Sequence, residues 1–376
     1  MVNASLEAVH GGGTAERTYC LAQYLARLGE QVSVLTTDIG GGDRRLAALP
    51  GITLIVLHSL MDRFYLPTPA IHRIYRAVRD ADVVHLMNHW TAINVLAYWA
   101  ARLAGRPYVV SPAGALPAFG RSKRIKALYN ALAGRAMVRH AARGIAITAS
   151  EIPQFAEYGL PAGRIAVIPN GVELHDADAT TEPDIPVAML SDKPYILFLG
   201  RLNSIKGPDL LLEAFLAAAD DFPNVHLALA GPDEGLEESL RAKATHSTAV
   251  TRIHFVGAVS GGAKRWLLQN AKLVAIPSRQ EAMSIVVLEA GAQGRPVLLT
   301  DQCGFPQLAE IGGGAIVPAT ARAIEGGLRE LLMADAQLGG MGLRLREAIE
   351  KRYTWDAAAL ALRNCLIEVV GEVPER

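Results

Sequence analysis

Cysteine is scarce in this sequence, which holds only Cys20, Cys303 and Cys365 among 376 residues. Their number is odd, their spacing is wide and no C-x-x-C pair occurs, so the sequence indicates neither a disulfide framework nor a cysteine-ligated metal site. Such cysteines suit a reducing compartment. We expect all three to be small, buried packing residues without chemistry of their own.

Long hydrophobic runs and a secretory leader are also missing. No window comes near about eighteen consecutive apolar residues without a charge, which argues against a membrane-spanning helix. The N-terminal residues lack the basic and then apolar layout of a signal peptide. We therefore expect a cytoplasmic protein.

The composition is that of a packed globular protein, with 51% hydrophobic and 20% charged residues. A chain of 376 residues is too long for one ordinary hydrophobic core. Two domains are therefore the natural expectation.

The net charge is zero, but the charges are unevenly distributed along the chain. Residues 1–170 hold 18 Lys and Arg against 10 Asp and Glu, and the remainder holds 19 against 27. The segment from Val83 to Ser150 has no acidic residue and contains a basic cluster: Arg121, Lys123, Arg124, Lys126, Arg135, Arg139 and Arg143. Such a region can bind an anionic acceptor or an anionic membrane surface, and a solvated helix face is the alternative.

Short apolar, β-branched runs alternate with longer helical patterns, which indicates βαβ units and parallel sheets. The first half contains "TLIVLH", "DVVHLM", "RPYVVSPAG" and "GIAITAS", and the second contains "YILFLG", "VHLALAGP", "LVAIPS" and "RPVLLTD". We expect an α/β protein with two doubly wound domains, over residues 1–171 and 193–352. A polar linker over 172–192 joins them, and an amphipathic helix over 353–376 can pack back on the N-terminal domain.

A glycine-rich segment, "HGGGTAERT", lies between the first expected strand and the first expected helix. Its glycines would let the backbone of a loop approach a phosphate at the amino end of the helix. The segment fails the G-x-G-x-x-G fingerprint because Glu16 stands where the third glycine belongs, and no P-loop sequence occurs. A tight strand-to-helix turn without a ligand remains the alternative.

Two cations follow the first strand of the second domain in "YILFLGRLNSIKG". Arg201 and Lys206 are five residues apart in a loop that ends at Gly207. The carboxyl ends of parallel strands are where such sheets bind ligands. Two cations there would neutralise a departing diphosphate, unless they are ordinary surface charges.

Two glutamates in "SRQEAMSIVVLEAG" are separated by seven residues. Eight helical steps turn about 80° from the starting face, so Glu281 and Glu289 would not align on one continuous helix. We expect Ser284 to be the N-cap of a helix that carries Glu289, with Glu281 in the loop before it. The free N–H groups of Ile285 and Val286 would then face a diphosphate.

These features together describe the binding of a nucleotide sugar. Glu289 would accept hydrogen bonds from the two ribose hydroxyls, and Glu281 would meet the hydroxyls of the group on the distal phosphate. Backbone groups near Val256 to Val259 are candidates for recognition of the base.

The motifs "GRLNSIKG", "LALAGPDEG", "IHFVGAVS" and "PSRQEAMSIVVLEAGAQGRPVLLTD" resemble the C-terminal half of the retaining family 4 glycosyltransferases, whose signature is E-x7-E. The N-terminal "GGGTAERTYCLAQYLARLGEQVSVLT", "DVVHL" and "IAVIPNGVE" fit the same family. The resemblance implies a GT-B fold of two Rossmann-like lobes, with the donor in the cleft and the nucleotide held mainly by the C-terminal lobe. It implies an acceptor-binding N-terminal lobe, no metal and no cofactor, with a UDP-, GDP- or ADP-sugar as substrate.

The family pattern assigns six of these positions to the donor: Arg201 and Lys206 to the diphosphate, Glu281 to the sugar, Glu289 to the ribose, and Gly12 with Gly13 to the phosphates. One position departs from the pattern. Many members carry a histidine in an "HG" pair near the donor sugar, whereas this chain reads "SPAGAL" with Ala113 in that place.

Other residues are candidates for the role of the missing histidine or for contacts with sugar or acceptor: His10, His89 and Asn170. Both histidines have a structural or solvated alternative. In a retaining mechanism the acceptor attacks on the face that the diphosphate leaves, and the departing phosphate can accept the proton, so a dedicated base is not required.

The function expected from the resemblance is retaining sugar transfer to a glycan or lipid-linked acceptor, in the synthesis of cell-surface polysaccharide or glycoconjugates. The location expected is the cytoplasm, including the inner face of the plasma membrane. A nucleotide-sugar epimerase and a catalytically silent nucleotide-binding protein are alternatives. A metal-dependent GT-A enzyme would need a D-x-D after an apolar strand. The D-x-D of Asp176 and Asp178 lies in the acidic linker, where a solvated turn is expected.

Overall fold

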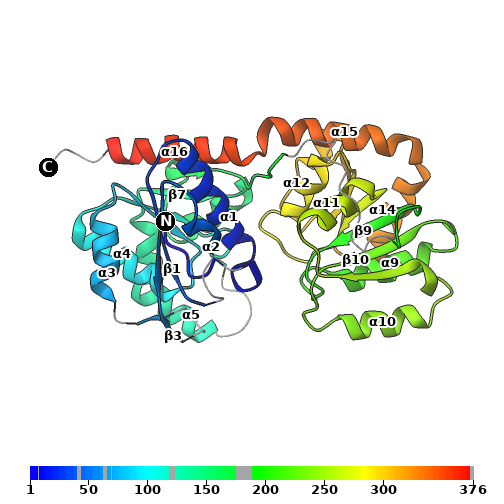
Figure 1. The fold of residues 1–376 in the computed structure, drawn as a ribbon, viewed down its shortest axis with the longest axis horizontal. Helices are drawn as coiled ribbons and strands as arrows, with labels where there is room; N and C mark the ends of the chain where they lie inside the picture. The colour runs from blue at the N-terminus through cyan, green and yellow to red at the C-terminus, as the bar shows by residue number, and fades with distance from the viewer. Residues whose placement is uncertain are drawn as a thin grey trace. The chain divides into compact units, whose positions relative to one another are not determined.

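The computed structural model describes residues 1–6, 8–39, 44–61, 66–68, 70–117, 123–174 and 189–372. It divides into two compact units (Figure 1). The first unit contains Met1–Gly171 together with Trp355–Arg376, and the second contains Val172–Thr354.

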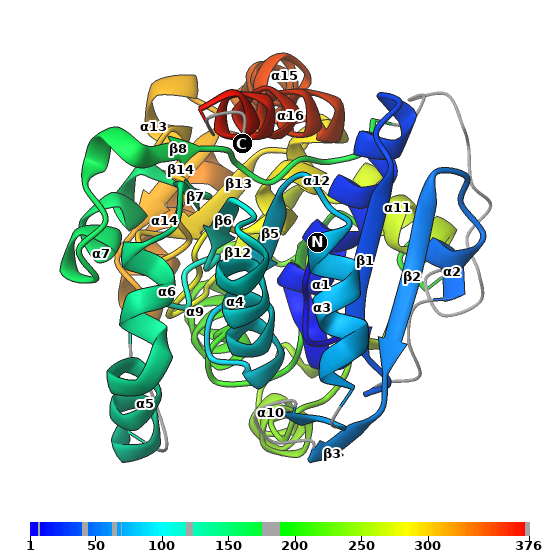
Figure 2. The same cartoon turned by 90° about the vertical axis from the view of Figure 1, so that its left-hand side faces the viewer.

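The first unit contains a parallel sheet whose central strands are buried. Its strands are β1 (Val32–Thr37), β2 (Ile52–Leu57), β5 (Val84–Met87), β6 (Tyr108–Ser111), β7 (Arg143–Ala146) and β8 (Ile165–Val167). Val2 bridges both Leu35 of β1 and Leu86 of β5, so the start of the chain completes the sheet between these strands. The order is β2, β1, chain start, β5, β6, β7 and β8 (Figure 2).

Full burial explains why β5 and β6 do not show the alternating pattern of a half-exposed strand. Every residue of β5 and of β6 is buried. Two short antiparallel strands, β3 (Ser59–Met61) and β4 (Leu66–Pro67), also belong to this unit. The helices are α1 (Ala8–Arg27), α2 (Arg44–Ala47), α3 (Ile71–Arg79), α4 (Ala92–Ala104), α5 (Lys123–Tyr129), α6 (Arg135–Arg139), α7 (Ile152–Glu157) and α16 (Trp355–Gly371).

The glycine-rich segment is helical rather than the loop that the sequence predicts. Helix α1 begins at Ala8, and a sharp kink at Gly12 interrupts it, with φ 53° and ψ −144°. Only glycine adopts this backbone conformation readily. A Cβ at Gly12 would meet no atom within 4 Å, so the backbone angles and not crowding require glycine there.

Helix α16 follows the second unit in the chain but packs in the first. Its buried residues Trp355, Leu362 and Val369 share a hydrophobic core with Leu21 and Leu25 of α1. The apolar stripe of α16 is thereby covered, as an amphipathic helix requires.

The second unit contains a six-stranded parallel sheet in the order β11, β10, β9, β12, β13 and β14. Its strands are β9 (Tyr195–Leu199), β10 (His226–Ala230), β11 (Ile253–Gly257), β12 (Leu273–Ile276), β13 (Val297–Thr300) and β14 (Gly314–Val317). The helices are α9 (Pro208–Ala218), α10 (Glu237–Thr245), α11 (Gly261–Asn270), α12 (Ile285–Ala292), α13 (Leu308–Ile311), α14 (Ala321–Met333) and α15 (Asp335–Arg352). This strand order is that of a doubly wound sheet, as predicted.

The three cysteines are free and buried, which confirms the expectation for them. Burial raises the pKa of the Cys303 thiol to about 11, so this thiol is not poised to react. No helix in the described part of the chain is long and apolar enough to cross a bilayer.

Candidate functional site

The predicted donor residues of the second unit gather at the switch point of its sheet. Strands β9 and β12 are neighbours there, and the chain leaves them in opposite directions. The segment after β9 carries Arg201 and Lys206, and the segment after β12 carries Glu281. In open α/β sheets, ligands bind outside the carboxyl ends of the strands at this point.

Lys206 and Glu281 come together across the switch point. The Lys206 Nζ lies 3.0 Å from Glu281 Oε2, and both side chains are largely buried. Ser278 donates its hydroxyl to Glu281 Oε1. Both carboxylate oxygens therefore have partners, and the carboxylate is held in one orientation.

Gly207 allows the two segments to approach closely. It has φ +70°, and a Cβ on it would lie 2.2 Å from the carbonyl oxygen of Pro277. A larger residue is therefore excluded both by the backbone conformation and by contact with the backbone after β12.

Arg201 and Asn203 share one acidic partner. Arg201 Nη1 lies 2.8 Å from Glu234 Oε1, and Asn203 donates to the other carboxylate oxygen over 2.6 Å. Asn203 Oδ1 also accepts the backbone N–H of Lys206 over 2.9 Å. Glu234 thus orders the segment that carries both predicted cations, a role that the motif alone does not reveal.

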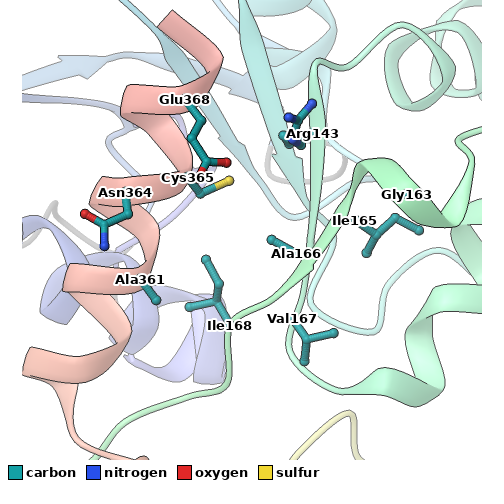
Figure 3. A pocket seen from close by; sticks show the side chains of 10 residues that line it. All are labelled: Arg143, Gly163, Ile165, Ala166, Val167, Ile168, Ala361, Asn364, Cys365 and Glu368. Carbon is teal, nitrogen blue, oxygen red and sulfur yellow. The ribbon is translucent and has the colours of Figure 1, made fainter. Parts of the chain in front are cut away.

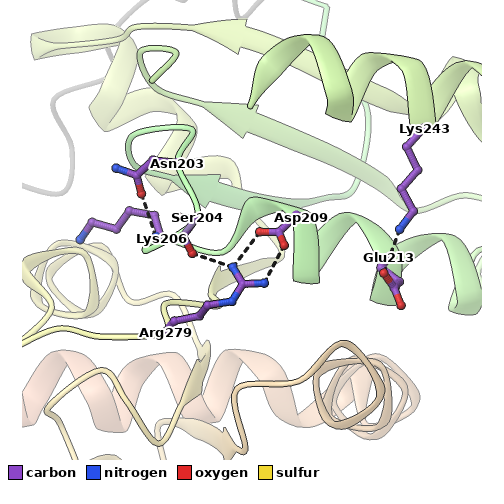
Figure 4. Close-up of polar contacts among 7 residues, drawn as sticks. All are labelled: Asn203, Ser204, Lys206, Asp209, Glu213, Lys243 and Arg279. Atoms are coloured by element: carbon purple, nitrogen blue, oxygen red, sulfur yellow. Dashed lines mark hydrogen bonds and ion pairs between the residues drawn. The ribbon is translucent and has the colours of Figure 1, made fainter. Parts of the chain in front are cut away.

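A third ion pair joins these two segments (Figure 4). Arg279 contacts both carboxylate oxygens of Asp209, at 2.9 and 2.6 Å, and donates to the carbonyl oxygen of Ser204. The fork geometry of guanidinium and carboxylate fixes the segment after β12 against the segment after β9 and the start of α9.

Ser284 and Glu289 lie where the sequence predicts, before and on a helix. Helix α12 begins at Ile285, and Ser284 has the extended backbone of an N-cap. Its side chain makes no capping bond: the Ser284 hydroxyl is fully buried and has no hydrogen-bond partner. A buried hydroxyl without a partner is costly, and it stands at a helix terminus that favours an anion.

Glu289 has a partner that sequence reasoning missed. Lys264 of α11 places its Nζ 2.6 Å from Glu289 Oε1. The segment "SGGAKRW" carries no motif, so only the packing of α11 beside α12 reveals the pair. Helix α11 follows the segment near Val256 to Val259, the candidate for base recognition.

In the first unit, Gly12 and Gly13 lie at the kink of α1 and in the turn after it. His10 belongs to the same helix, and its side chain lies outside the described residues. The part of α1 after the kink lies close to the chain start that runs between β1 and β5. Asn3 of that segment donates to the Thr18 hydroxyl and to the carbonyl oxygen of Thr14, both on α1.

His89 is enclosed by aromatic side chains. Its ring lies 4.6 Å from the centroid of Trp90 and 5.3 Å from those of Tyr129 and Tyr158, and its Nε2 lies 3.3 Å from Asn130 Oδ1. The residue is 1% exposed. Burial lowers the pKa of His89 to about 4, so the imidazole is neutral at pH 7. This environment favours the structural alternative for His89.

Asn170 is buried and accepts a hydrogen bond from Arg17 Nη1 over 2.9 Å. Arg17 also donates to the carbonyl oxygens of Ile168 and Pro169. Ala113 lies in the turn after β6 with φ 54°, an uncommon conformation for a residue other than glycine.

Several other predictions concern residues without a described placement. Asp176, Asp178 and Arg121 lie outside the described residues, and so does the side chain of Lys123. Within the described ranges, no cluster of three or more His, Cys, Asp or Glu is arranged to hold a metal ion.

A separate cavity of about 400 Å³ lies in the first unit between the segment of β8 and helix α16 (Figure 3). It is lined by Arg143, Gly163, Ile165, Ala166, Val167, Ile168, Ala361, Asn364, Cys365 and Glu368. Of the residues predicted to bind donor or acceptor, these include only Arg143, the last member of the basic cluster.

Two family models match this chain in consecutive ranges. The model described as a glycosyl transferase 4-like domain matches residues 12–171. The model described as glycosyl transferases group 1 matches residues 184–352. Together they span most of the sequence.

Relatives with known names cover nearly the whole chain. The phosphatidyl-myo-inositol mannosyltransferase of Mycobacterium leprae is 28% identical over 356 residues, which are 93% of this chain and 91% of that protein. The D-inositol 3-phosphate glycosyltransferase of Mycolicibacterium paratuberculosis is 26% identical over 378 residues, covering 91% of this chain and 82% of its own.

Solved structures share the fold. Anabaena Alr3699/HepE, crystallised in complex with UDP, matches with a TM-score of 0.79 and 18% identity over 98% of both chains. The sucrose-phosphate synthase of Thermosynechococcus elongatus matches with a TM-score of 0.73 and 20% identity, over 96% of this chain and 95% of its own.

Proposed function

This chain belongs to the group 1 glycosyltransferases, which have the GT-B fold, and we propose that its donor is a nucleoside diphosphate sugar. The sugar passes to a hydroxyl of a glycan or lipid-linked acceptor, with retention of the anomeric configuration and without a metal ion. The solved structures of Alr3699/HepE in complex with UDP and with UDP-glucose support a donor of this class.

The observation that carries the proposal is the pairing of Lys206 with Glu281, three residues before the orphaned Ser284 hydroxyl. Lys206 supplies positive charge at the switch point, while the Ser284 hydroxyl and the amino end of α12 supply unused donors. A diphosphate would satisfy all of them, because its oxygens accept hydrogen bonds and carry negative charge. Glu281 then remains to bind a sugar hydroxyl.

In the proposed reaction the bond between the anomeric carbon and the diphosphate oxygen breaks, and the acceptor oxygen bonds to the same face. The proton of the acceptor hydroxyl passes to the departing phosphate. Lys206 and Arg201 stabilise the charge that develops on the leaving group, which is the main demand of an oxocarbenium-like transition state. The absence of the family histidine at Ala113 is compatible with this route.

The names of the relatives guide the choice of acceptor. One is a phosphatidyl-myo-inositol mannosyltransferase and another a D-inositol 3-phosphate glycosyltransferase. We therefore propose an anionic, polyol-bearing acceptor. The excess of basic residues in the first half of the chain supports that choice, because it attracts anionic molecules.

A membrane-bound acceptor is the form that the surface of the first unit favours. Helix α5 and the π-helical turn Asn130–Gly134 expose Ile125, Leu128 and Leu132 by 45%, 58% and 69%. Arg124, Arg135 and Arg139 are exposed on the same stretch of chain. Apolar side chains among basic ones are typical of helices that lie in an anionic bilayer surface.

The donor is tested by thermal shift with UDP, GDP and ADP and with their sugars. A nucleotide present at 100 times its dissociation constant stabilises the protein by about 2.7 kcal/mol. One base should stand out from the other two. If none of the compounds changes the melting temperature, the donor assignment is wrong.

The reaction is tested with radiolabelled sugar in the donor that binds. Transfer of label to inositol 3-phosphate or to phosphatidylinositol vesicles supports the proposal. Release of an epimerised donor identifies the epimerase alternative, and binding without either reaction identifies a silent nucleotide-binding protein. Cosedimentation with vesicles of anionic but not of zwitterionic lipid, lost in Leu128→Asp, tests the membrane surface.

A further inference from the structure

Two residues of the first unit adopt a strained backbone conformation. Asn88, with φ 70°, and Ala113, with φ 54°, are the non-glycine residues with positive φ in the described part of the chain. Asn88 directly follows β5, and Ala113 lies two residues beyond β6. Because β5 and β6 are parallel neighbours, both strained residues lie at the same edge of the sheet.

That edge is where ligands bind. Strand β5 adjoins the start of the chain at the switch point of this sheet, and ligands of doubly wound sheets bind outside the carboxyl ends of such strands. Strained residues also gather at active sites and ligand clamps, where the surrounding structure holds them in place. Any contact that holds the turn at Ala113 would therefore also shape the ligand site at this edge.

The turn after β6 is fixed from two sides. The Ala115 N–H donates to the carbonyl oxygen of Pro112 over 3.1 Å, and the carbonyl oxygen of Ala115 accepts from Trp90 Nε1. The Gly114 N–H donates to Glu151 Oε2 over 3.0 Å. Glu151 is thus the side chain that binds the backbone of the strained turn itself.

Glu151 is well placed for such a role. It is 2% exposed, and its other oxygen, Oε1, accepts the N–H of Ile147 over 3.0 Å. Burial raises the pKa of Glu151, while the N–H bonds from Gly114 and Ile147 and the charge of Arg17 oppose that rise. A buried carboxylate needs such compensation.

Arg17, on the kinked helix, is a buried charge that acts on the Glu151 carboxylate. It is 1% exposed, and it binds the carbonyl oxygens of Ile168 and Pro169 and the side chain of Asn170. Arg17 lies on α1, five residues after Gly12. Arg17 therefore joins helix α1 to the segment after β8 by hydrogen bonds, and it interacts with Glu151 electrostatically.

We propose that Glu151 is a positioning residue that holds the Ala113–Gly114 turn in its left-handed conformation, so that the turn forms part of the acceptor-binding site of the first unit. The inference rests on the proposed transferase function. The proposal assigns Glu151 no contact with the substrates; its two oxygens bind the backbone N–H groups of Gly114 and Ile147. Its contribution is to place the turn.

The test compares Glu151→Gln with the wild-type enzyme, using the donor and acceptor that the wild type turns over. Glutamine has nearly the same shape but offers one acceptor oxygen, and its amide group faces one of the two N–H donors. We expect kcat to fall about ten- to hundredfold, as for other small misplacements in active sites. The dissociation constant of the nucleotide, whose proposed site lies in the second unit, stays within about twofold of the wild-type value.

A rescue experiment separates positioning from general stability. Glycine adopts positive φ without strain, so Ala113→Gly in the Glu151→Gln background restores part of the lost kcat. Ala113→Val disfavours positive φ, so it should lower kcat without any change at Glu151. This variant tests the role of the turn if Glu151→Gln does not fold. Glu157→Gln, at an exposed position of α7, is the matched control with unchanged kcat.

The outcomes distinguish the two levels of the argument. If the wild type transfers no sugar, the proposed function is wrong. If it transfers sugar but Glu151→Gln matches Glu157→Gln, the positioning role is wrong. The role is also wrong if nucleotide affinity falls in parallel with kcat, or if Ala113→Gly restores nothing while Ala113→Val has no effect.

Discussion

At the scale of single residues, Glu281 and Glu289 have the same chemistry but different environments. Both oxygens of Glu281 are engaged, by Ser278 and Lys206. Glu289 is paired through Oε1 with Lys264. The first carboxylate is therefore fixed beside the proposed diphosphate site, and the second is oriented from the helix that follows the candidate base segment.

Lys206→Ala and Arg201→Ala should each slow transfer strongly. Each substitution removes one preorganised positive group from the leaving diphosphate and costs about 2–4 kcal/mol in the barrier, or about thirty- to a thousandfold in rate. Single-turnover kinetics with the radiolabelled donor measures this loss.

The matched control for these variants is Lys243→Ala. Lys243 pairs with Glu213 over 2.8 Å in the same unit, between α10 and α9 (Figure 4). It should leave turnover unchanged, because exposed ion pairs contribute little. Near-normal rates in both site variants would remove Arg201 and Lys206 from the proposed site.

Lys264→Met removes the partner that orients the Glu289 carboxylate. Nucleotide binding should weaken by about tenfold, because the misplaced Glu289 loses most of one charge-assisted hydrogen bond to the ribose. Calorimetric titration with the nucleotide and with its 2′-deoxy analogue measures the effect. The preference for the ribonucleotide should shrink in Lys264→Met, and Lys264→Arg should retain part of it. An unchanged preference would argue against a role for Glu289 at the ribose.

At the scale of elements, the sequence predicts the strands and the start of α12 well, because buried parallel strands and N-caps leave local signals. The kink at Gly12 was not predicted, since its angles depend on how α1 meets the sheet. Lys264, Arg279 and Glu151 were missed for a related reason. Their partners lie 25, 70 and 37 residues away in the chain, and no local pattern encodes such contacts.

Two neighbouring strands also hold a histidine pair that should make stability depend on pH. His226 Nδ1 of β10 lies 2.9 Å from His254 Nε2 of β11. Burial, the neighbouring histidine and Lys193 lower the pKa of His254 to about 4, and burial with the charges of Lys193 and Arg252 lowers the pKa of His226. The pair cannot keep its hydrogen bond when both rings are protonated.

The sign follows from proton linkage. Between the folded pKa of about 4 and the unfolded pKa of about 6.5, the unfolded state binds more protons, so stability falls as the pH drops from 7 to 5. Allowing for partial exposure, we expect a loss of about 1 kcal/mol from His254. Urea unfolding at both pH values measures it. His254→Gln should flatten the dependence and the exposed His246→Gln should not; equal slopes in the two variants would contradict this account.

At the scale of the whole molecule, the position of a segment in the chain does not decide in which unit it packs. The amphipathic pattern of residues 353–376 predicts a helix but does not decide which core covers its apolar stripe. The structure assigns α16 to the first unit, next to α1, although the whole second unit precedes it in the chain. The free energy of unfolding of the first unit should therefore depend on residues after Trp355.

Leu362→Ala tests this dependence. Leu362 is fully buried in the core that it shares with Leu21 and Leu25, so its truncation should cost the first unit about 2–5 kcal/mol. Leu360→Ala, on the same helix at a position 48% exposed, should cost much less. Calorimetry with and without the bound nucleotide identifies the transition of each unit, because the proposed ligand residues of the second unit stabilise that unit on binding. If Leu362→Ala lowers the nucleotide-sensitive transition and leaves the other unchanged, α16 stabilises the second unit, and the division of the chain into these two units is wrong.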